Sequence, residues 1–144
     1  MTRLQKWAML CHSIAMLLLA GFGVIYLFKT EFMPYHAIAV GRSWAEIDAG
    51  LQLLLLALMK VAGGGWLATA IAIGVLLAWP FRAGLRWSYW AIPAIGLVAA
   101  LSSLFVTIYM ANHSPANPPW FAAAIGVCCL CAGLILSLNS KSPQ

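Results

Sequence analysis

Lys60 is the residue whose chemistry needs the most explanation, because it is a cation inside the longest apolar run of the chain. The run extends from Leu51 to Trp79, with the triplet Gly63–Gly65 and then Trp66 shortly after the lysine. A cation in such a run needs a polar partner, a cavity or a route to water for its ammonium group. The sequence therefore predicts either a pocket beside Lys60 and Trp66 or a lysine that reaches the surface of a membrane.

No carboxylate is placed to neutralise Lys60. Asp48 lies about 18 Å away along a straight helix. We expect the partners of Lys60 to be carbonyl groups freed at the glycine triplet, or hydroxyl groups from neighbouring segments, namely Tyr26, Thr107 and Tyr109. An acid supplied by a partner subunit is the alternative.

The other candidate site consists of titratable side chains outside the apolar runs. They are His36, Glu46, Asp48 and His113. An integral membrane enzyme could use carboxylates and imidazoles of this kind for acid–base catalysis. Each histidine also has a methionine close by in the sequence, and this pair of ligands suits soft metals. Loop histidines are ordinarily solvated, so we predict no metal site.

The cysteines and the remaining histidine are predicted to be structural. Cys128, Cys129 and Cys131 fall within an apolar run, where cysteine behaves as a small hydrophobic residue. Cys128 and Cys131 share a helix face, which leaves thiol chemistry open. His12 is the only histidine within an apolar run, whereas a haem in a membrane bundle usually needs two axial ligands. No phosphate-binding, nucleophile-elbow or zinc-protease motif is present, so we predict no cofactor and no catalytic residues.

Composition places the chain among integral membrane proteins. Of its 144 residues, 64% are hydrophobic and only 8% are charged, which is more apolar than a soluble domain requires. The apolar runs are continuous rather than alternating, so they predict helices. The net charge of +5 comes from residues scattered around the ends of these runs, unlike the basic face that binds nucleic acid.

The runs predict an all-α fold, a polytopic transmembrane four-helix bundle that forms a single domain over residues 1–144. The expected spans are residues 7–28, 47–79, 87–110 and 120–139. The first span is longer than the apolar core of a signal peptide, so we expect it to be retained. The second, at about 50 Å, is too long for one upright span. We therefore expect a long second helix, kinked near Gly63–Gly65.

The start of the second span is ambiguous. Ser43 and Glu46 have the spacing of a capping box, which predicts a helix that begins near Trp44. Residues 44–59 are then either continuous with the span or a separate helix at the outer end of the bundle. The leucine-rich part of this segment has no polar face, so we favour one continuous helix.

Charge predicts that both termini are cytoplasmic, since basic residues mark cytoplasmic ends of spans. With four spans, the side of the N-terminus holds Arg3, Lys6, Arg82, Arg86 and Lys141. The opposite side holds Lys29, Arg42 and the acids Glu31, Glu46 and Asp48. Small residues recur every four positions on the spans and predict close helix packing. Examples are Gly96 and Ala100, Ala99, Ser103 and Thr107, and Ala122 and Gly126.

Several short motifs punctuate the apolar runs. They are residues 32–36 (Phe-Met-Pro-Tyr-His), Gly41–Arg42, Trp44, Gly63–Gly65, Pro80–Arg82 and Pro118–Trp120. In these motifs the chain resembles small four-span bacterial inner-membrane proteins of unknown function, over most of its length. The resemblance implies the four-span architecture and a bacterial inner-membrane location, but no particular chemistry.

Three functions remain open. We expect first a non-catalytic membrane protein that acts through partners, either as an accessory or assembly subunit or as a homo-oligomer, because its loops are short and its spans carry faces of small residues. The second is a binder or carrier of a hydrophobic small molecule, a lipid or quinone, in a pocket near Lys60 and Trp66. The third is an integral membrane enzyme that uses the outer polar cluster. The expected partners are membrane lipids and another protein chain or a second copy, and not nucleic acid.

Overall fold

The computed structural model describes residues 1–140 and is helical throughout that range apart from its short connections. Four helices within it are long and apolar enough to cross a membrane. They are α1 (Arg3–Phe28), α3 (Ala49–Leu76), α4 (Arg86–His113) and α5 (Trp120–Leu138). The chain is therefore a multi-pass membrane protein with a helical bundle, as its composition predicts. Lys141, which was counted among the basic residues, lies outside the described residues.

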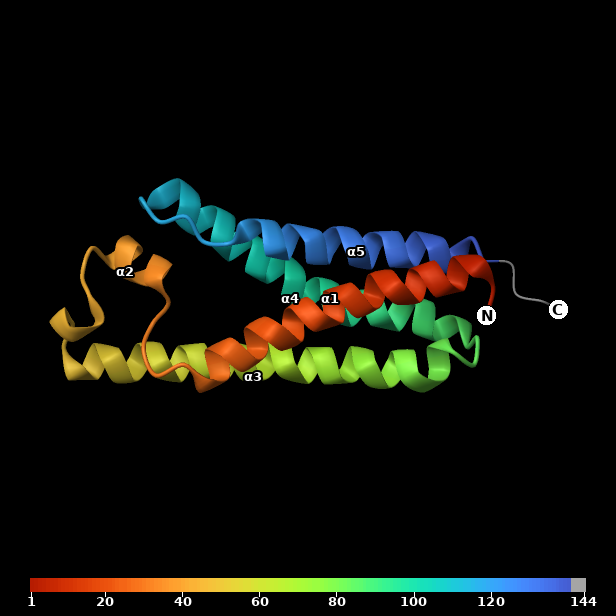
Figure 1. The fold of residues 1–144 in the computed structure, drawn as a ribbon, viewed down its shortest axis with the longest axis horizontal. Helices are drawn as coiled ribbons and strands as arrows, with labels where there is room; N and C mark the ends of the chain where they lie inside the picture. Colours follow the sequence, from red (N-terminus) through yellow and green to blue (C-terminus); the bar gives the residue numbers. More distant parts are fainter. Residues whose placement is uncertain (141–144) are drawn as a thin grey trace.

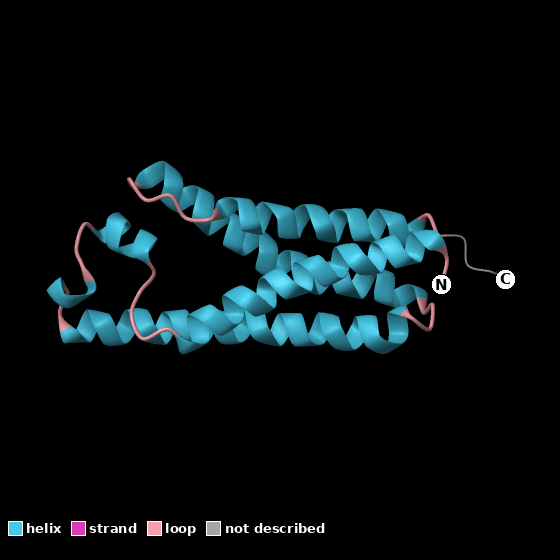
Figure 2. Ribbon diagram, viewed as in Figure 1, coloured by secondary structure: helices cyan, strands magenta, loops and turns pink. Residues whose placement is uncertain are grey.

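Three short elements join the long helices (Figure 2). The helix α2 (Pro34–Val40) and the 3-10 turn η1 (Trp44–Glu46) lie between α1 and α3. The π-helical turn η2 (Leu77–Phe81) extends α3 and contains Pro80, which has no N–H to donate. Gly84 follows in a left-handed conformation, with φ at +74°, and the chain then turns back into α4.

Polar side chains set the start of α1. Thr2 donates its backbone N–H to Oε1 of Gln5 (2.7 Å), and Gln5 donates its N–H to Oγ1 of Thr2 (3.2 Å). This reciprocal pair is a capping box, which satisfies two amide groups that a helix start leaves without partners. The start of α1 is thus set by local hydrogen bonds between Thr2 and Gln5.

The start of α3 differs from the predicted one. Ser43 donates its N–H to Oε2 of Glu46 (2.7 Å), as expected of this pair, but the contact closes only the short turn η1. Asp48 caps the long helix instead, since its Oδ1 accepts from the N–H of Leu51 (3.0 Å). Residues 49–59 are therefore continuous with the second span, whereas residues 44–46 form a separate turn.

The two ends of the bundle carry different elements (Figure 1). The start of α1, the described end of α5 and the α3–α4 connection lie together, and we call this the basic end. It includes Arg3, Lys6, Arg82 and Arg86. The opposite end, which we call the α2 end, holds α2, η1 and the α4–α5 connection. The three acids Glu31, Glu46 and Asp48 all belong to the segment between α1 and α3 at this end.

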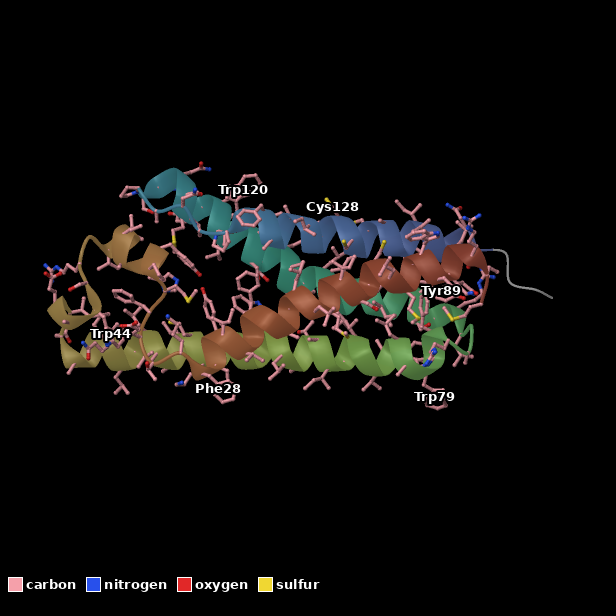
Figure 3. All side chains as sticks on the ribbon, in the orientation of Figure 1. Phe28, Trp44, Trp79, Tyr89, Trp120 and Cys128 are labelled. Atoms are coloured by element: carbon pink, nitrogen blue, oxygen red, sulfur yellow. The ribbon has the colours of Figure 1, made fainter. Side chains whose placement is uncertain are left out.

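The core is densest toward the basic end. Ile73, Phe81, Ile92 and Leu130 are completely buried and belong to one cluster, to which all four long helices contribute. Near the same end, the Gln5 amide donates to the Tyr89 hydroxyl (2.7 Å), and Tyr89 lies between the helices in Figure 3. This packing joins the four long helices toward the basic end.

Other large side chains face outward from the bundle. Phe28 and Trp79 project away from the helices in Figure 3 and expose 71% and 74% of their surfaces. Exposed apolar side chains along all four long helices agree with a bundle that is surrounded by lipid.

The glycine triplet of α3 lies where α3 meets α1. A Cβ placed on Gly63 would approach the carbonyl oxygen of Gly23 and the backbone nitrogen of Leu27, each at 2.8 Å. A Cβ on Gly23 would likewise lie 2.9 Å from the backbone nitrogen of Leu67. The two backbones therefore pack directly against each other, as helices in lipid do where both carry small residues.

The structure does not show the kink that was expected near Gly63–Gly65. α3 is α-helical without interruption from Ala49 to Leu76, and its departure from α-helical geometry comes later, at η2. The missing side chain of Gly63 allows close contact with α1. The excess length that motivated the kink is accommodated differently, because the first turns of α3 extend beyond α1 at the α2 end (Figure 1).

Replacing Gly63 with alanine should destabilise the bundle by about 1–3 kcal/mol, the usual cost of overpacking, because the new Cβ meets backbone atoms that cannot rotate away. Gly64 is the matched control, since a Cβ there meets no atom within 4 Å. Gly64→Ala should preserve or raise stability, because alanine is the better helix former. SDS titration of mixed micelles, followed by circular dichroism, measures both variants. Equal unfolding midpoints for the two would contradict the direct backbone contact.

Candidate functional site

The candidate site is a cavity of about 460 Å³ in the half of the bundle nearer the α2 end. One side is formed by α1 and α3, the other by α4 and α5, and α2 and the α4–α5 connection contribute at the α2 end. The lining is mostly apolar and includes Leu19, Phe22, Leu55, Met59, Ala62, Trp66, Val106, Met110, Ala123 and Leu130. The bundle thus contains a space that suits an apolar molecule.

The tilt of α1 accounts for this cavity. In Figure 1 the start of α1 lies beside α5 and its end lies beside α3. The contact at Gly23 and Gly63 holds the later part of α1 on α3. Because α1 leaves α5 as it approaches α3, no helix fills the space between the two sides toward the α2 end.

A second close contact holds α1 and α5 together at the basic end. The His12 ring packs against Gly133, where a Cβ would come within 2.5 Å of the ring. His12 is completely buried, and neither ring nitrogen has a hydrogen-bond partner within residues 1–140. Its ring edge meets Phe81, with the ring centroids 5.9 Å apart. This histidine fills a core position and does not line the cavity.

Aromatic side chains form the cavity wall on α1 and α3. Trp66 and Tyr26 pack edge to face with their ring centroids 4.8 Å apart, and the ring centroid of Phe22 lies 6.4 Å from that of Trp66. All three line the cavity. Trp66 and Tyr26, both expected near a ligand, are therefore brought together by the structure.

Hydrogen-bond donors gather where α2 meets α1. The hydroxyl groups of Tyr26 and Tyr35 are hydrogen-bonded to each other, and His36 lies beside Tyr35 with ring centroids 4.5 Å apart. Nδ1 of His36 accepts from the backbone N–H of Met33 (3.3 Å), which places the proton of the neutral ring on Nε2. Burial lowers the pKa of His36 and raises that of Tyr35, which the hydrogen bond to Tyr26 raises further. Both side chains are therefore neutral near pH 7.

Hydroxyl groups on α4 line the opposite wall. Thr107 donates its hydroxyl to the backbone carbonyl of Ser103 (2.8 Å), and Ser103 donates to that of Ala99 (2.6 Å). Ser102 is bonded to Val98 in the same way. Thr107 was expected near a ligand and faces the cavity, whereas Ser103, which the sequence assigned only to helix packing, faces it as well. The recurrence of small polar residues was the available signal, and it fits a cavity wall as well as a packed interface.

Lys60 caps the end of α1. Its Nζ donates to the backbone carbonyl of Leu27 (2.9 Å), one of the last four carbonyls of the helix, which have no partner within it. The helix dipole also favours a cation at this end. A carbonyl partner was expected, but from the glycine triplet rather than from another helix. The Lys60 side chain is exposed and does not line the cavity.

Tyr109 lies away from the main cavity. Its ring stacks on His113 with the centroids 4.1 Å apart, and 55% of its surface is exposed. Both residues line a separate shallow hollow on α4. Of the five side chains expected near a ligand, Tyr26, Trp66 and Thr107 therefore line the cavity, whereas Lys60 and Tyr109 do not.

The structure does not join the four residues of the outer polar cluster by hydrogen bonds or ion pairs within residues 1–140. Glu46 closes η1 and Asp48 caps α3. His113 is bonded through Nδ1 to the Tyr109 carbonyl (2.9 Å), and only His36 lines the main cavity. The hydrogen bond from Ser43 also lowers the pKa of Glu46. Each of these residues thus has a local structural role of its own.

The cysteines are free thiols that lie apart from the cavity lining. Cys128 and Cys131 are exposed on the outer surface of α5, and Cys11 and Cys129 are half-buried. Within the described residues, no three or more of the His, Cys, Asp and Glu side chains are grouped as a metal site would need.

Comparison with known proteins adds no family assignment. No protein-family model, curated protein or solved structure matches the chain at a significant level. The resemblance to small four-span proteins is supported only by the four long apolar helices of the structure.

Lys60→Met should lower bundle stability by about 1 kcal/mol, because the Leu27 carbonyl loses its donor and the helix end loses its cation. Lys60→Arg should retain most of the stability, since a guanidinium can donate to the same carbonyl. The SDS unfolding midpoint, measured in identical micelles, compares the variants. A Met variant as stable as the native protein would remove the capping role.

Proposed function

We propose that this protein is a non-catalytic membrane protein that binds a hydrophobic small molecule, a lipid or a quinone, in the cavity between α1, α3, α4 and α5. The cavity itself carries the proposal. Its volume of about 460 Å³ falls within the roughly 300–1,000 Å³ of small-molecule sites, which are typically apolar with a few convergent polar groups. Here the polar groups are the hydroxyls of α1, α2 and α4 and the imidazole of His36.

The aromatic wall supports an apolar ligand. Tyr26, Trp66 and Phe22 present ring surfaces from helices that hold each other in place, so little conformational entropy is lost when a chain or ring packs against them. A ligand dissolved in the bilayer would also reach such a site without crossing water. Lys60 takes no part in the proposed pocket, so of the two residues around which the sequence placed the pocket only Trp66 lines it.

Action through a protein partner, the function expected first from the sequence, remains a prediction. The small residues that suggested it are largely used within the bundle: Gly96, Ala100, Ala122 and Gly126 are buried. These residues lie inside the bundle, and Ala100, Ala122 and Gly126 line the cavity. A catalytic role for the outer polar cluster likewise remains a prediction, and no contact among its members favours it.

Filling the cavity tests ligand binding. Ala123 lines the cavity, whereas its neighbour Ala124 does not. Ala123→Phe should reduce ligand retention at least about tenfold by occupying the space, and Ala124→Phe should leave it unchanged. Native mass spectrometry of each protein, purified in mild detergent from the same cells, measures the bound mass. Equal retention by both variants, or a native protein without bound small molecules, would overturn the proposal.

The same spectra address the function through partners. A stable complex with a second protein, or a dimer that persists in both Ala123→Phe and Ala124→Phe, would favour the partner function over the cavity. A monomer that retains an apolar molecule would favour the cavity.

We further propose that the protein resides in a bacterial inner membrane with both termini in the cytoplasm. The grouping of Arg3, Lys6, Arg82 and Arg86 at one end of the bundle supports this orientation, because basic residues are retained on the cytoplasmic side.

Cysteine labelling tests the orientation. A single cysteine at Ala83, at the basic end, should be protected from a membrane-impermeant maleimide in intact cells. A single cysteine at Arg42, at the α2 end, should react with the same reagent. Both sites are placed in a chain whose four native cysteines are replaced by alanine. Labelling at Ala83 and protection at Arg42 would reverse the orientation.

A further inference from the structure

We propose that the ligand is a neutral amphiphile with a hydroxyl head group, such as an alcohol or a glyceride, rather than a quinone or an anionic lipid. This inference rests on the proposed function, since it specifies what the same cavity binds. It follows from the direction in which each polar group of the two walls can donate or accept a hydrogen bond.

The wall on α4 can only accept hydrogen bonds from a ligand. A serine or threonine hydroxyl has one proton and two lone pairs. Ser103 and Thr107 each donate that proton to a backbone carbonyl of their own helix, at 2.6 and 2.8 Å. What they leave for the cavity is lone pairs, so this wall recognises a head group that carries a proton to donate.

The wall on α1 and α2 can donate. Between the Tyr26 and Tyr35 hydroxyls, one proton lies in their mutual hydrogen bond and the other is left over. His36 accepts at Nδ1 from Met33, so its Nε2–H is also a donor. This wall recognises a head group that has a lone pair to offer.

A hydroxyl group is a small neutral group that can pair with either wall, because it donates one hydrogen bond and accepts others. A quinone carbonyl or an ether oxygen only accepts, so it leaves the α4 wall without a partner. A charged head would enter a cavity whose described lining contains no Lys, Arg, Asp or Glu, and an uncompensated charge in an apolar site is strongly disfavoured.

Three probes with one chain and different heads test the head group. They are 9,10-dibromostearyl alcohol, its methyl ether and 9,10-dibromostearic acid. Bromine quenches tryptophan at short range, and Trp66 lines the cavity. The Trp66 signal is taken as the difference between the native protein and Trp66→Phe in the same micelles. The alcohol should reach half-quenching at about fivefold lower concentration than the ether, and at least about tenfold lower than the ionised acid.

Variants of the two walls should respond differently. Ser103→Ala combined with Thr107→Val and Ser102→Ala removes the hydroxyl acceptors of the α4 wall, so the preference for alcohol over ether should disappear. Tyr35→Phe combined with His36→Phe removes two donors of the other wall. The alcohol and the ether should then both bind more weakly, while the ratio of their half-quenching concentrations stays the same. Thr69→Val is the matched control, since Thr69 donates to the Gly65 carbonyl (2.8 Å) in the same way but does not line the cavity. This variant should keep the native preference.

The source of the hydroxyl is tested by competition against the dibrominated alcohol. Relief of quenching by dioleoylglycerol would assign it to a glycerolipid, and relief by geranylgeraniol would assign it to an isoprenoid alcohol. Relief by neither would overturn the proposal.

The failure of this inference can be told apart from failure of the proposed function. Equal quenching by alcohol, ether and acid would overturn the hydroxyl preference while leaving a hydrophobic cavity ligand in place. If none of the three probes quenched Trp66, the cavity function itself would fall.

Discussion

The direct contact of the α1 and α3 backbones is the constraint on which the rest of the structure depends. Gly23 and Gly63 allow a separation that any side chain would prevent. This contact draws the later part of α1 away from α5, and the cavity lies in the space that is left. The same pairing brings the end of α1 within reach of Lys60, whose ammonium group donates a hydrogen bond to the Leu27 carbonyl there. A packing contact between two small residues therefore determines both the shape of the site and the surroundings of Lys60.

The architecture was largely predictable from the sequence, because lipid requires long apolar helices and the sequence contains four such runs. The ends of the helices were less predictable. Ser43 and Glu46 have the spacing of a helix start and make one of its contacts, but Asp48 begins the helix a few residues later. A capping motif indicates where amide groups can be satisfied, and tertiary packing decides which of two neighbouring motifs begins the long helix.

The site was predicted in part. Tyr26, Trp66 and Thr107 line the cavity, and their approximate depth in the spans could be read from residue position. Lys60 is at a similar depth but on another face, and periodicity within one helix does not fix how that helix is rotated against its neighbours. Gly63 shows a related limit: the absence of a side chain permits bending and permits contact, and the contact with α1 could not be read from α3 alone.

The contact of His12 with Gly133 has a consequence for the dimensions of the cavity. It lies toward the basic end, where α1 meets α5, whereas the cavity opens toward the other end, where α1 meets α3. Both contacts are made by the single helix α1. The His12–Gly133 contact fixes its position against α5, and the Gly23–Gly63 contact fixes its tilt toward α3. A bulkier residue at position 133 would displace α1 from α5 and change the width of the cavity, although residue 133 does not line it. The width of the cavity thus depends on residues outside its lining.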